Sequence, residues 1–320
     1  MKIKCAVIDD FQGVAESLAD WARLGPEVEV RFLRAHEPDP ERLAEEIGDC
    51  DIVVAMRERT PFREELLSRL PNLRLLITSG MQNASIDLEA AERYGVTVCG
   101  TASATHPTVE LTWALLLGLA RHVVTENTAL RHNGPWQQTL GTDLHGRRLG
   151  VIGLGRIGAR VAQVGAAFGM DVVAWSRNLT DERAAEAGAR RLAALDDLLE
   201  TSDFVTVHVK PGEDTRGLLG ADELARMRPS AYLINTSRSS IVDQDALATA
   251  LREGQIAGAG VDVFDIEPLP PGHEYRTLPN LLATPHLGYV TRDNYRGYFS
   301  DAVEDIEAFL AGAPVRVLAP

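Results

Sequence analysis

Three side chains in the last third of the chain could cooperate in one reaction. Arg238, Glu267 and His286 each stand close behind a short apolar run typical of a strand. A guanidinium grips a carboxylate and polarises the adjacent carbonyl, and an imidazole exchanges protons near neutral pH. A carboxylate bonded to that imidazole fixes its tautomer and favours its charged form. The set suits reduction of a ketone by hydride transfer, because the resulting alkoxide needs a proton donor at its oxygen.

Each of the three has an ordinary interpretation when taken alone. A histidine after Thr-Pro is commonly a loop or capping residue, Glu267 before Pro268 suits a turn, and Arg238 suits a surface charge. Their shared position favours the chemical interpretation. Ligands of an open α/β sheet bind beyond the carboxyl ends of its strands, and all three residues follow predicted strands downstream of one glycine-rich turn.

That turn has the spacing Gly153-x-Gly155-x-x-Gly158 and contains Arg156 and Ile157. It follows a predicted strand and opens a predicted helix, which is the context that dinucleotide binding requires. The first glycine permits a tight turn, the second lets the backbone approach a pyrophosphate, and the third lets the helix pack on the strand. Free N–H groups at the helix start then attract phosphate. A glycine-rich turn without a ligand is the alternative.

The end of the next strand indicates which dinucleotide binds. An acidic residue about 20 positions after the glycines would bond the ribose 2′-hydroxyl of NAD. The chain has Ser176 and Arg177 there, and Asp171 lies at the opposite end of that strand. A hydroxyl and a guanidinium can bind a 2′-phosphate without repelling it. We therefore favour NADP over NAD, with a solvated Arg177 as the alternative.

Positioning these residues requires parallel sheets, and β-branched runs alternate with amphipathic stretches along the chain. We expect an α/β fold of two doubly wound units. Strands are predicted at residues 3–8, 28–33, 51–55, 74–78, 96–99, 149–152, 171–175, 204–207, 231–234, 258–263 and 281–283. Helices are predicted at 14–23, 40–47, 62–70, 87–94, 107–122, 156–168 and 291–310, with others between the later strands.

Composition narrows the function further. The chain has 320 residues and a formal charge of −14, which suits two domains and disfavours nucleic-acid binding. The apolar run Leu111–Ala120 is too short for a membrane span, and early acids exclude a signal-peptide core. Three scattered cysteines indicate a reducing cytoplasm, without a disulfide framework or a metal site. We expect a cytoplasmic protein that acts on a small molecule.

Four ordered motifs closely resemble the D-isomer-specific 2-hydroxyacid dehydrogenases, such as glyoxylate/hydroxypyruvate reductases and phosphoglycerate dehydrogenases. They are Gly153–Gly158, Asn235-Thr-Ser-Arg238, Asp262-Val-Phe-Asp-Ile-Glu267-Pro-Leu-Pro and Thr284-Pro-His286-Leu-Gly. The resemblance covers nearly the whole chain. It implies that each chain has two Rossmann-like domains with the active site in the cleft between them. It also implies that two chains form a homodimer. Residues 1–101 and 289–320 would form the substrate domain, and 102–288 the dinucleotide-binding domain.

The resemblance also implies roles for single residues. Arg238 would bind substrate, Glu267 would support the histidine, and His286 would be the acid–base catalyst. Gly80 and Met81 would lie in a substrate-carboxylate loop, and Arg57 would contact a distal group or phosphate unless it is solvated. Besides the glycine turn, Ser176 and Arg177, the cofactor would contact Thr108, His208, Thr215, Thr236 and Asp262, the last through the nicotinamide carboxamide.

Some positions depart from the family pattern. Ser239 stands where glycine is usual, Pro211 lies one place late, and Ser176 replaces a common aspartate. The leading hypothesis is an NAD(P)-dependent oxidoreductase that interconverts a 2-keto acid and a D-2-hydroxy acid. The alternative is a dinucleotide-sensing protein of the corepressor type. Formate oxidation is disfavoured, because formate enzymes usually carry glutamine where Glu267 stands.

Overall fold

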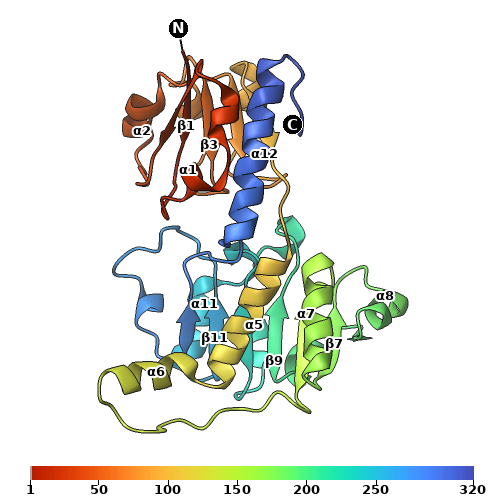
Figure 1. Ribbon diagram of the computed structural model, residues 1–320. Helices are drawn as coiled ribbons and strands as arrows, with labels where there is room; N and C mark the ends of the chain where they lie inside the picture. The colour runs from red at the N-terminus through yellow and green to blue at the C-terminus, as the bar shows by residue number, and fades with distance from the viewer. Residues whose placement is uncertain (1) are drawn as a thin grey trace. The chain divides into compact units, whose positions relative to one another are not determined.

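The computed structural model describes residues 2–320 and divides into two compact units. Unit 1 comprises Met1–Ala104 and Thr291–Pro320, and unit 2 comprises Thr105–Val290. Each unit has a parallel sheet with helices packed on it (Figure 1). The predicted fold class, two parallel-sheet α/β units, is confirmed.

The sheet of unit 1 has the order β2-β1-β3-β4-β5. Every residue of the two strands β3 and β4 is buried, as expected when helices cover both faces of a parallel sheet. The predicted strands agree with the structure to within about two residues at each end. The strands are β1 (Ile3–Val7), β2 (Val28–Phe32), β3 (Ile52–Ala55), β4 (Leu75–Thr78) and β5 (Thr97–Gly100).

Two groups of helices cover this sheet. One core cluster joins it to α2 (Pro40–Ile47), α3 (Glu64–Leu67) and α4 (Leu88–Arg93). The other group consists of α12 (Arg292–Leu310), α1 (Ala15–Leu18) and η1 (Trp21–Leu24). In it, α12 packs against α1, η1 and the strand β4. The single helix predicted at 14–23 is wrong, because the chain is extended at Ala19. Trp21 explains the break: its indole packs on Phe32 and its N–H donates to the Ala15 carbonyl at 2.9 Å.

The sheet of unit 2 has the order β12-β11-β10-β9-β6-β7-β8. Its predicted strands are confirmed with small shifts at the ends, whereas the two-residue edge strand β8 was not predicted. The strands are β6 (Arg148–Ile152), β7 (Asp171–Trp175), β8 (Arg190–Arg191), β9 (Phe204–Val207), β10 (Tyr232–Asn235), β11 (Gly258–Val261) and β12 (Leu281–Ala283).

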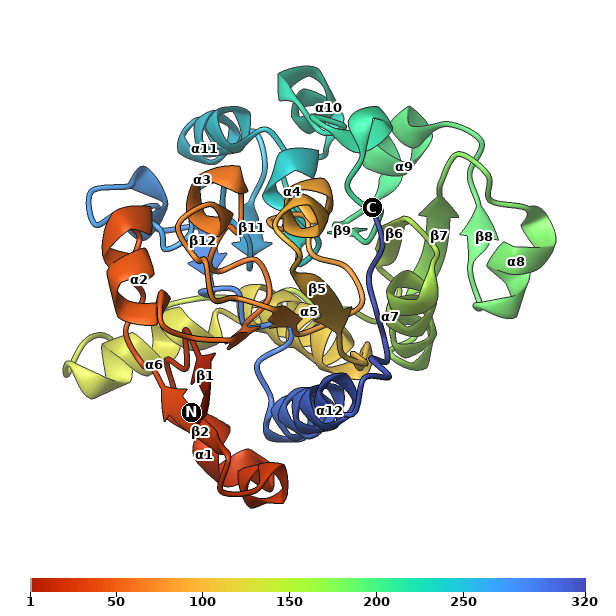
Figure 2. The same ribbon diagram turned by 90° about the horizontal axis from the view of Figure 1, so that it is seen from above.

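Helices of unit 2 form two cores, one on each face of the sheet (Figure 2). One face carries α5 (His106–Ala120), α7 (Arg156–Ala167) and α8 (Asp181–Glu186), and the other α9 (Leu195–Thr201), α10 (Ala221–Arg226) and α11 (Gln244–Arg252). Short 3₁₀ turns complete the unit: η2 (Glu213–Thr215), η3 (Ser239–Ile241) and η4 (Glu274–Arg276).

The apolar run predicted to be a buried helix lies in α5, which is confirmed as a core element. The helix predicted at 107–122 ends two residues early, since His122 takes a left-handed conformation with φ of 49°. A further helix, α6 (Val123–Arg131), follows it and has no buried residue. Across residues 2–320, no helix is long and apolar enough to cross a membrane.

Candidate active site

The order of strands in unit 2 explains how distant residues reach one edge. Because all strands are parallel, their carboxyl ends share that edge, and the residues that follow them line up in the order of the strands. From one side of the sheet to the other these are His286 after β12, Glu267 after β11, Arg238 after β10, His208 after β9, Gly153 after β6 and Ser176 after β7.

His286 and Glu267 form a direct pair. The ring Nδ1 of His286 lies 2.6 Å from Oε2 of Glu267, and the Phe264 N–H donates to the other carboxylate oxygen at 3.0 Å. The His286 ring packs edge-on against Tyr289, and its backbone has a φ of 52°. Since Nδ1 is bound to the carboxylate, Nε2 is the ring nitrogen that can exchange a proton with a reactant.

The loop that carries Glu267 is braced by Gln244, which the sequence analysis did not single out. The side-chain oxygen of Gln244 accepts the Asp265 N–H at 3.2 Å, and its amide nitrogen lies 2.9 Å from the His273 ring. The Gln244 carbonyl also accepts the Tyr275 hydroxyl at 2.9 Å. One side chain at the start of α11 therefore connects both ends of the loop that presents Glu267.

Asp262 holds the loop that carries His286. Its carboxylate accepts hydrogen bonds from the Thr284 hydroxyl and from the N–H groups of Leu287 and Gly288, each at 2.7 Å. Burial raises the pKa of Asp262, and these hydrogen bonds oppose that shift. The predicted contact of Asp262 with a cofactor amide stays a prediction.

Arg238 follows β10 as expected, and its loop is held by Asn235, whose amide donates to the Arg238 carbonyl at 3.0 Å. The nearby Thr236 hydroxyl is 2.8 Å from that of Thr112 on α5. Thr108, also on α5, donates to the Gly288 carbonyl at 2.9 Å. The two threonines predicted to lie against the cofactor therefore connect α5 to the loops that carry Arg238 and His286.

The glycine turn between β6 and α7 has the form of a phosphate cradle. Gly153 has a φ of 95°, and a side chain there would lie 2.6 Å from the Val209 nitrogen. A methyl group at Gly158 would overlap the Gly153 carbonyl oxygen. At Gly155, by contrast, the space is open, with no atom within 4 Å of the position a Cβ would take. The turn is closed toward the protein and open in front of α7, so these residues fit a dinucleotide.

Two neighbouring groups agree with this interpretation. The Nε2 atom of His208 is buried and has no hydrogen-bond partner within the described chain, and burial lowers the pKa of His208 to about 4. The ring is therefore neutral at pH 7 and retains a polar atom for a ligand. Gly153 and His208 also meet where the sheet order reverses between β6 and β9, the usual ligand position in such sheets.

Arg177 follows β7 as predicted, but the structure gives it a partner. Its guanidinium contacts the Asp214 carboxylate at 2.5 Å and the Asp214 carbonyl at 2.9 Å. Asp214 was not among the predicted site residues. The Thr215 hydroxyl donates to the Lys210 carbonyl at 2.7 Å and thereby stabilises the turn that holds Asp214.

Unit 1 places Arg57 and the Gly80–Met81 loop at the carboxyl ends of β3 and β4. The Arg57 guanidinium donates to the Ser79 carbonyl at 3.2 Å, and the Arg57 N–H donates to the Ser79 hydroxyl at 2.9 Å. Asn83 joins both loops, donating to the Arg57 carbonyl at 2.6 Å and the Thr78 hydroxyl at 2.8 Å. The Gly80 N–H is bound to the Thr101 hydroxyl at 3.0 Å.

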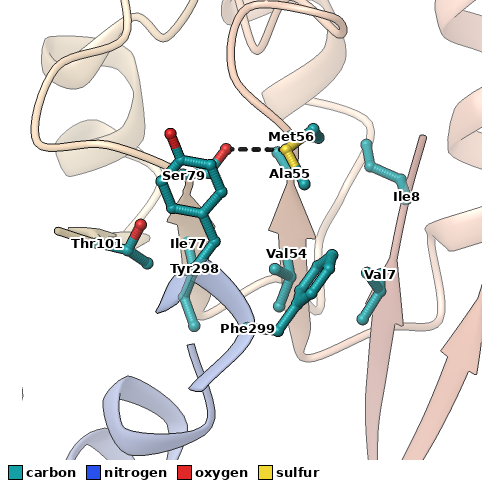
Figure 3. A pocket seen from close by; sticks show the side chains of 10 residues that line it. All are labelled: Val7, Ile8, Val54, Ala55, Met56, Ile77, Ser79, Thr101, Tyr298 and Phe299. Atoms are coloured by element: carbon teal, nitrogen blue, oxygen red, sulfur yellow. Dashed lines mark hydrogen bonds between the residues drawn. The ribbon is translucent and has the colours of Figure 1, made fainter. Parts of the chain in front are cut away.

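A small pocket lies next to Ser79 of this loop. It is lined from β1, β3, β4 and α12, and the hydroxyl groups of Ser79, Thr101 and Tyr298 are its polar lining (Figure 3). The Ser79 hydroxyl also contacts the Met56 sulfur at 3.2 Å, the dashed line in Figure 3.

Comparison with known proteins places the chain in a family. The model of the NAD binding domain of D-isomer specific 2-hydroxyacid dehydrogenases matches residues 113–288. This chain belongs to that family. The dehydrogenase is 40% identical over 257 residues to a glyoxylate reductase of Aeropyrum pernix, covering 78% of this chain and 76% of that one. It is 33% identical over 295 residues to a D-3-phosphoglycerate dehydrogenase of Bacillus subtilis, covering 91% of this chain but 55% of the relative.

Solved structures agree with this assignment. A putative D-3-phosphoglycerate dehydrogenase oxidoreductase of Ralstonia solanacearum superposes with a TM-score of 0.94 at 35% identity, over 100% of this chain and 97% of that one. A phosphoglycerate oxidoreductase of Vibrio cholerae gives 0.92 at 35% identity, over 97% and 100%. The dehydrogenase is thus an NAD-binding oxidoreductase that interconverts 2-keto and D-2-hydroxy acids, and the corepressor alternative is not favoured.

Proposed function

We propose that His286 is the acid–base catalyst, that Glu267 orients it, and that Arg238 binds the substrate carboxylate and polarises its carbonyl. The observation that carries the proposal is the 2.6 Å contact between His286 Nδ1 and Glu267, with the second carboxylate oxygen fixed by the Phe264 N–H. This arrangement fixes the ring and leaves Nε2 for the reactant. It is the general-acid geometry that a ketone reduction requires.

A dinucleotide held at the Gly153–Gly158 turn would supply or accept the hydride. In the reductive direction, His286 gives a proton from Nε2 to the carbonyl oxygen of the 2-keto acid, while the Glu267 carboxylate holds the ring through Nδ1. In the oxidative direction, neutral His286 takes the hydroxyl proton. Arg238 holds the carboxylate through its planar fork, so the reacting carbonyl is oriented.

Unit 2 is the proposed dinucleotide-binding domain and unit 1 the proposed substrate domain. In unit 1, Met81 is favoured over Gly80 as the N–H donor to the substrate carboxylate, because the Gly80 N–H is already bound to Thr101. Arg57 remains the candidate for a distal substrate group. The substrate class is a small 2-keto acid such as glyoxylate or hydroxypyruvate, in line with the relatives named glyoxylate reductase.

For the cofactor, Ser176 and Arg177 support acceptance of the 2′-phosphate of NADP beside NAD. No acidic residue ends β7, so the strand itself presents no charge that would repel a phosphate. To bind the Arg177 guanidinium, the 2′-phosphate would have to displace the Asp214 carboxylate from it.

A homodimer is proposed through α6 and the segment that follows it. α6 has no buried residue, and Leu130, Trp136 and Leu140 are 62%, 79% and 93% exposed. Residues 123–142 carry only one acidic and one basic side chain, Glu126 and Arg131, within a chain of charge −14. Two copies of such an acidic chain can meet at this neutral, apolar segment with little repulsion. Light scattering of a Trp136→Glu variant should then report a monomer.

The proposed location is the cytoplasm, which the three buried, free cysteines support. The proposed partner is a small-molecule acid, with no nucleic acid and no membrane.

The test of the proposed reaction is a panel of 2-keto acids with NADH and NADPH, followed by absorbance at 340 nm. Oxidation of at least one reduced nucleotide by a small 2-keto acid, with a D-2-hydroxy acid as product, is expected. Tight nucleotide binding without turnover of any keto acid would contradict the proposal.

A further inference from the structure

The ion pair between Arg177 and Asp214 stands at the point where cofactor phosphate specificity would be decided. Both contacts of Arg177 are with one residue: the carboxylate at 2.5 Å and the carbonyl oxygen at 2.9 Å. The planar fork of a guanidinium binds two oxygens side by side, which is also how it binds phosphate. Asp214 therefore occupies Arg177 in the manner that a phosphate would.

The strand order shows where this pair lies. β6 is between β9 and β7 in the sheet. Asp214 follows β9 and Arg177 follows β7, so the segment 208–216 crosses the carboxyl end of β6 to bring the two together. The glycine turn stands at that same end of β6. The pair accordingly lies beside the proposed dinucleotide site rather than at an unrelated surface.

Asp214 is held in place by a compact turn. The Thr215 hydroxyl bonds the carbonyls of Lys210 and Gly212 at 2.7 and 3.3 Å, and the Arg216 N–H bonds the Gly212 carbonyl at 3.0 Å. The carboxylate is thus presented by η2 rather than by a long flexible loop. Glu213 precedes it in the same turn and provides a matched acid for comparison.

We propose that Asp214 sets the balance between NAD(H) and NADP(H) by occupying Arg177. The inference rests on the proposed dinucleotide site. NAD has a 2′-hydroxyl and leaves the pair intact. The phosphate of NADP must displace Asp214 from Arg177 and then lie close to the displaced carboxylate. Removing the charge of Asp214 frees the guanidinium for phosphate and removes that repulsion.

The test measures binding without any keto acid, so catalysis is not needed. NADPH and NADH are titrated by their own fluorescence against the wild type, Asp214→Asn and Glu213→Gln. At low ionic strength, D214N should bind NADPH roughly tenfold more tightly, from the interaction of one carboxylate with a nearly dianionic phosphate. Its affinity for NADH should stay within about twofold. Salt near ~0.5 M should reduce the gain.

Two controls separate this mechanism from a general charge effect. E213Q removes an equal charge one residue away and should leave the ratio of the two affinities nearly unchanged. In an Arg177→Gln background, NADPH binding should be weaker, and adding D214N should produce only a fraction of the gain, since the repulsion is still relieved but no guanidinium is freed. Melting temperatures should stay near that of wild type, because the side chains of the pair are 55% and 76% exposed and such pairs contribute little to stability.

An unchanged ratio of NADPH to NADH affinity in D214N would overturn this inference and leave the proposed function intact. An equal gain in E213Q, or a full gain in the Arg177→Gln background, would overturn it as well. Failure of the wild type to bind either nucleotide would instead contradict the proposed function itself.

Discussion

Two glycines of the same turn should respond in opposite ways to the same substitution. A Cβ at position 158 would overlap the Gly153 carbonyl oxygen, a backbone atom held by the tight turn. A Cβ at position 155 would meet no atom within 4 Å, and the backbone there is extended, with φ of −84° and ψ of −160°. Gly158→Ala therefore tests packing within the protein, whereas Gly155→Ala tests the space in front of α7.

The magnitudes follow from that difference. Overpacking against fixed backbone destabilises by about 1–3 kcal/mol, and we expect the upper end for Gly158→Ala. In a unit of this size, about 3 kcal/mol lowers the melting temperature by roughly 6–12 °C. Gly155→Ala replaces a helix N-cap glycine and should cost about 0.5–1 kcal/mol. If a pyrophosphate approaches position 155, the methyl group added by Gly155→Ala should weaken dinucleotide binding about 10–100-fold.

The assay combines thermal melting without ligand with a fluorescence titration of NADH. The expected result is a large loss of melting temperature in G158A, and a nearly normal melting temperature with weak NADH binding in G155A. Wild-type NADH affinity in G155A would refute the placement of the phosphates. A wild-type melting temperature in G158A would refute the steric argument.

Three other changes have defined outcomes. His286→Asn should lower kcat by at least ~10²-fold while NADH binding, measured by fluorescence, persists; retained turnover would contradict its role as acid. Arg238→Lys should raise KM for the keto acid and lower kcat, because an ammonium lacks the planar fork. Steady-state kinetics measures both, and an unchanged KM or kcat would contradict the proposed role of Arg238. His208 should destabilise the fold on acidification: its folded pKa of about 4 lies below its unfolded value of 6.5, so stability is lost as pH falls from 6.5 toward 4. Urea unfolding should show His208→Gln losing about 2 kcal/mol less than wild type between pH 7.5 and 5.

The strands and the positions of the proposed catalytic residues follow from the sequence because both depend on local patterns. β-branched runs alternate with amphipathic stretches, and Arg238, Glu267 and His286 each stand just beyond such a run. The family motifs add the likeness that the comparisons confirm. In contrast, the helix predicted at 14–23 is interrupted by the packing of Trp21, which the local pattern does not contain.

Contacts between loops cannot be predicted from the local sequence pattern either, because their partners are distant in the sequence. Asp214 meets Arg177 across 37 positions of sequence, and it supplies the negative charge that the end of β7 lacks. Gly80 was predicted to lie in the substrate-carboxylate loop, and its N–H is already bound to the hydroxyl of Thr101, from the neighbouring strand end. In each case the partner comes from another strand of the sheet, so only the three-dimensional order of strands brings it into contact.

Two histidines at this edge of the sheet have different surroundings and therefore different chemical properties. His286 and His208 both follow strands of unit 2, and a sequence pattern describes them alike. Glu267 contacts the Nδ1 atom of one ring at 2.6 Å and leaves Nε2 for a reactant, as the proposed proton donor requires. The other ring has a buried Nε2 with no hydrogen-bond partner among residues 2–320, and burial lowers its pKa to about 4. A charged His208 beside the glycine turn would disturb the neutral contact expected of a cofactor-facing ring, whereas His286 without Glu267 would lose the contact that fixes its ring. The position of one carboxylate, in the loop that follows β11, therefore favours His286 over His208 as the proposed acid.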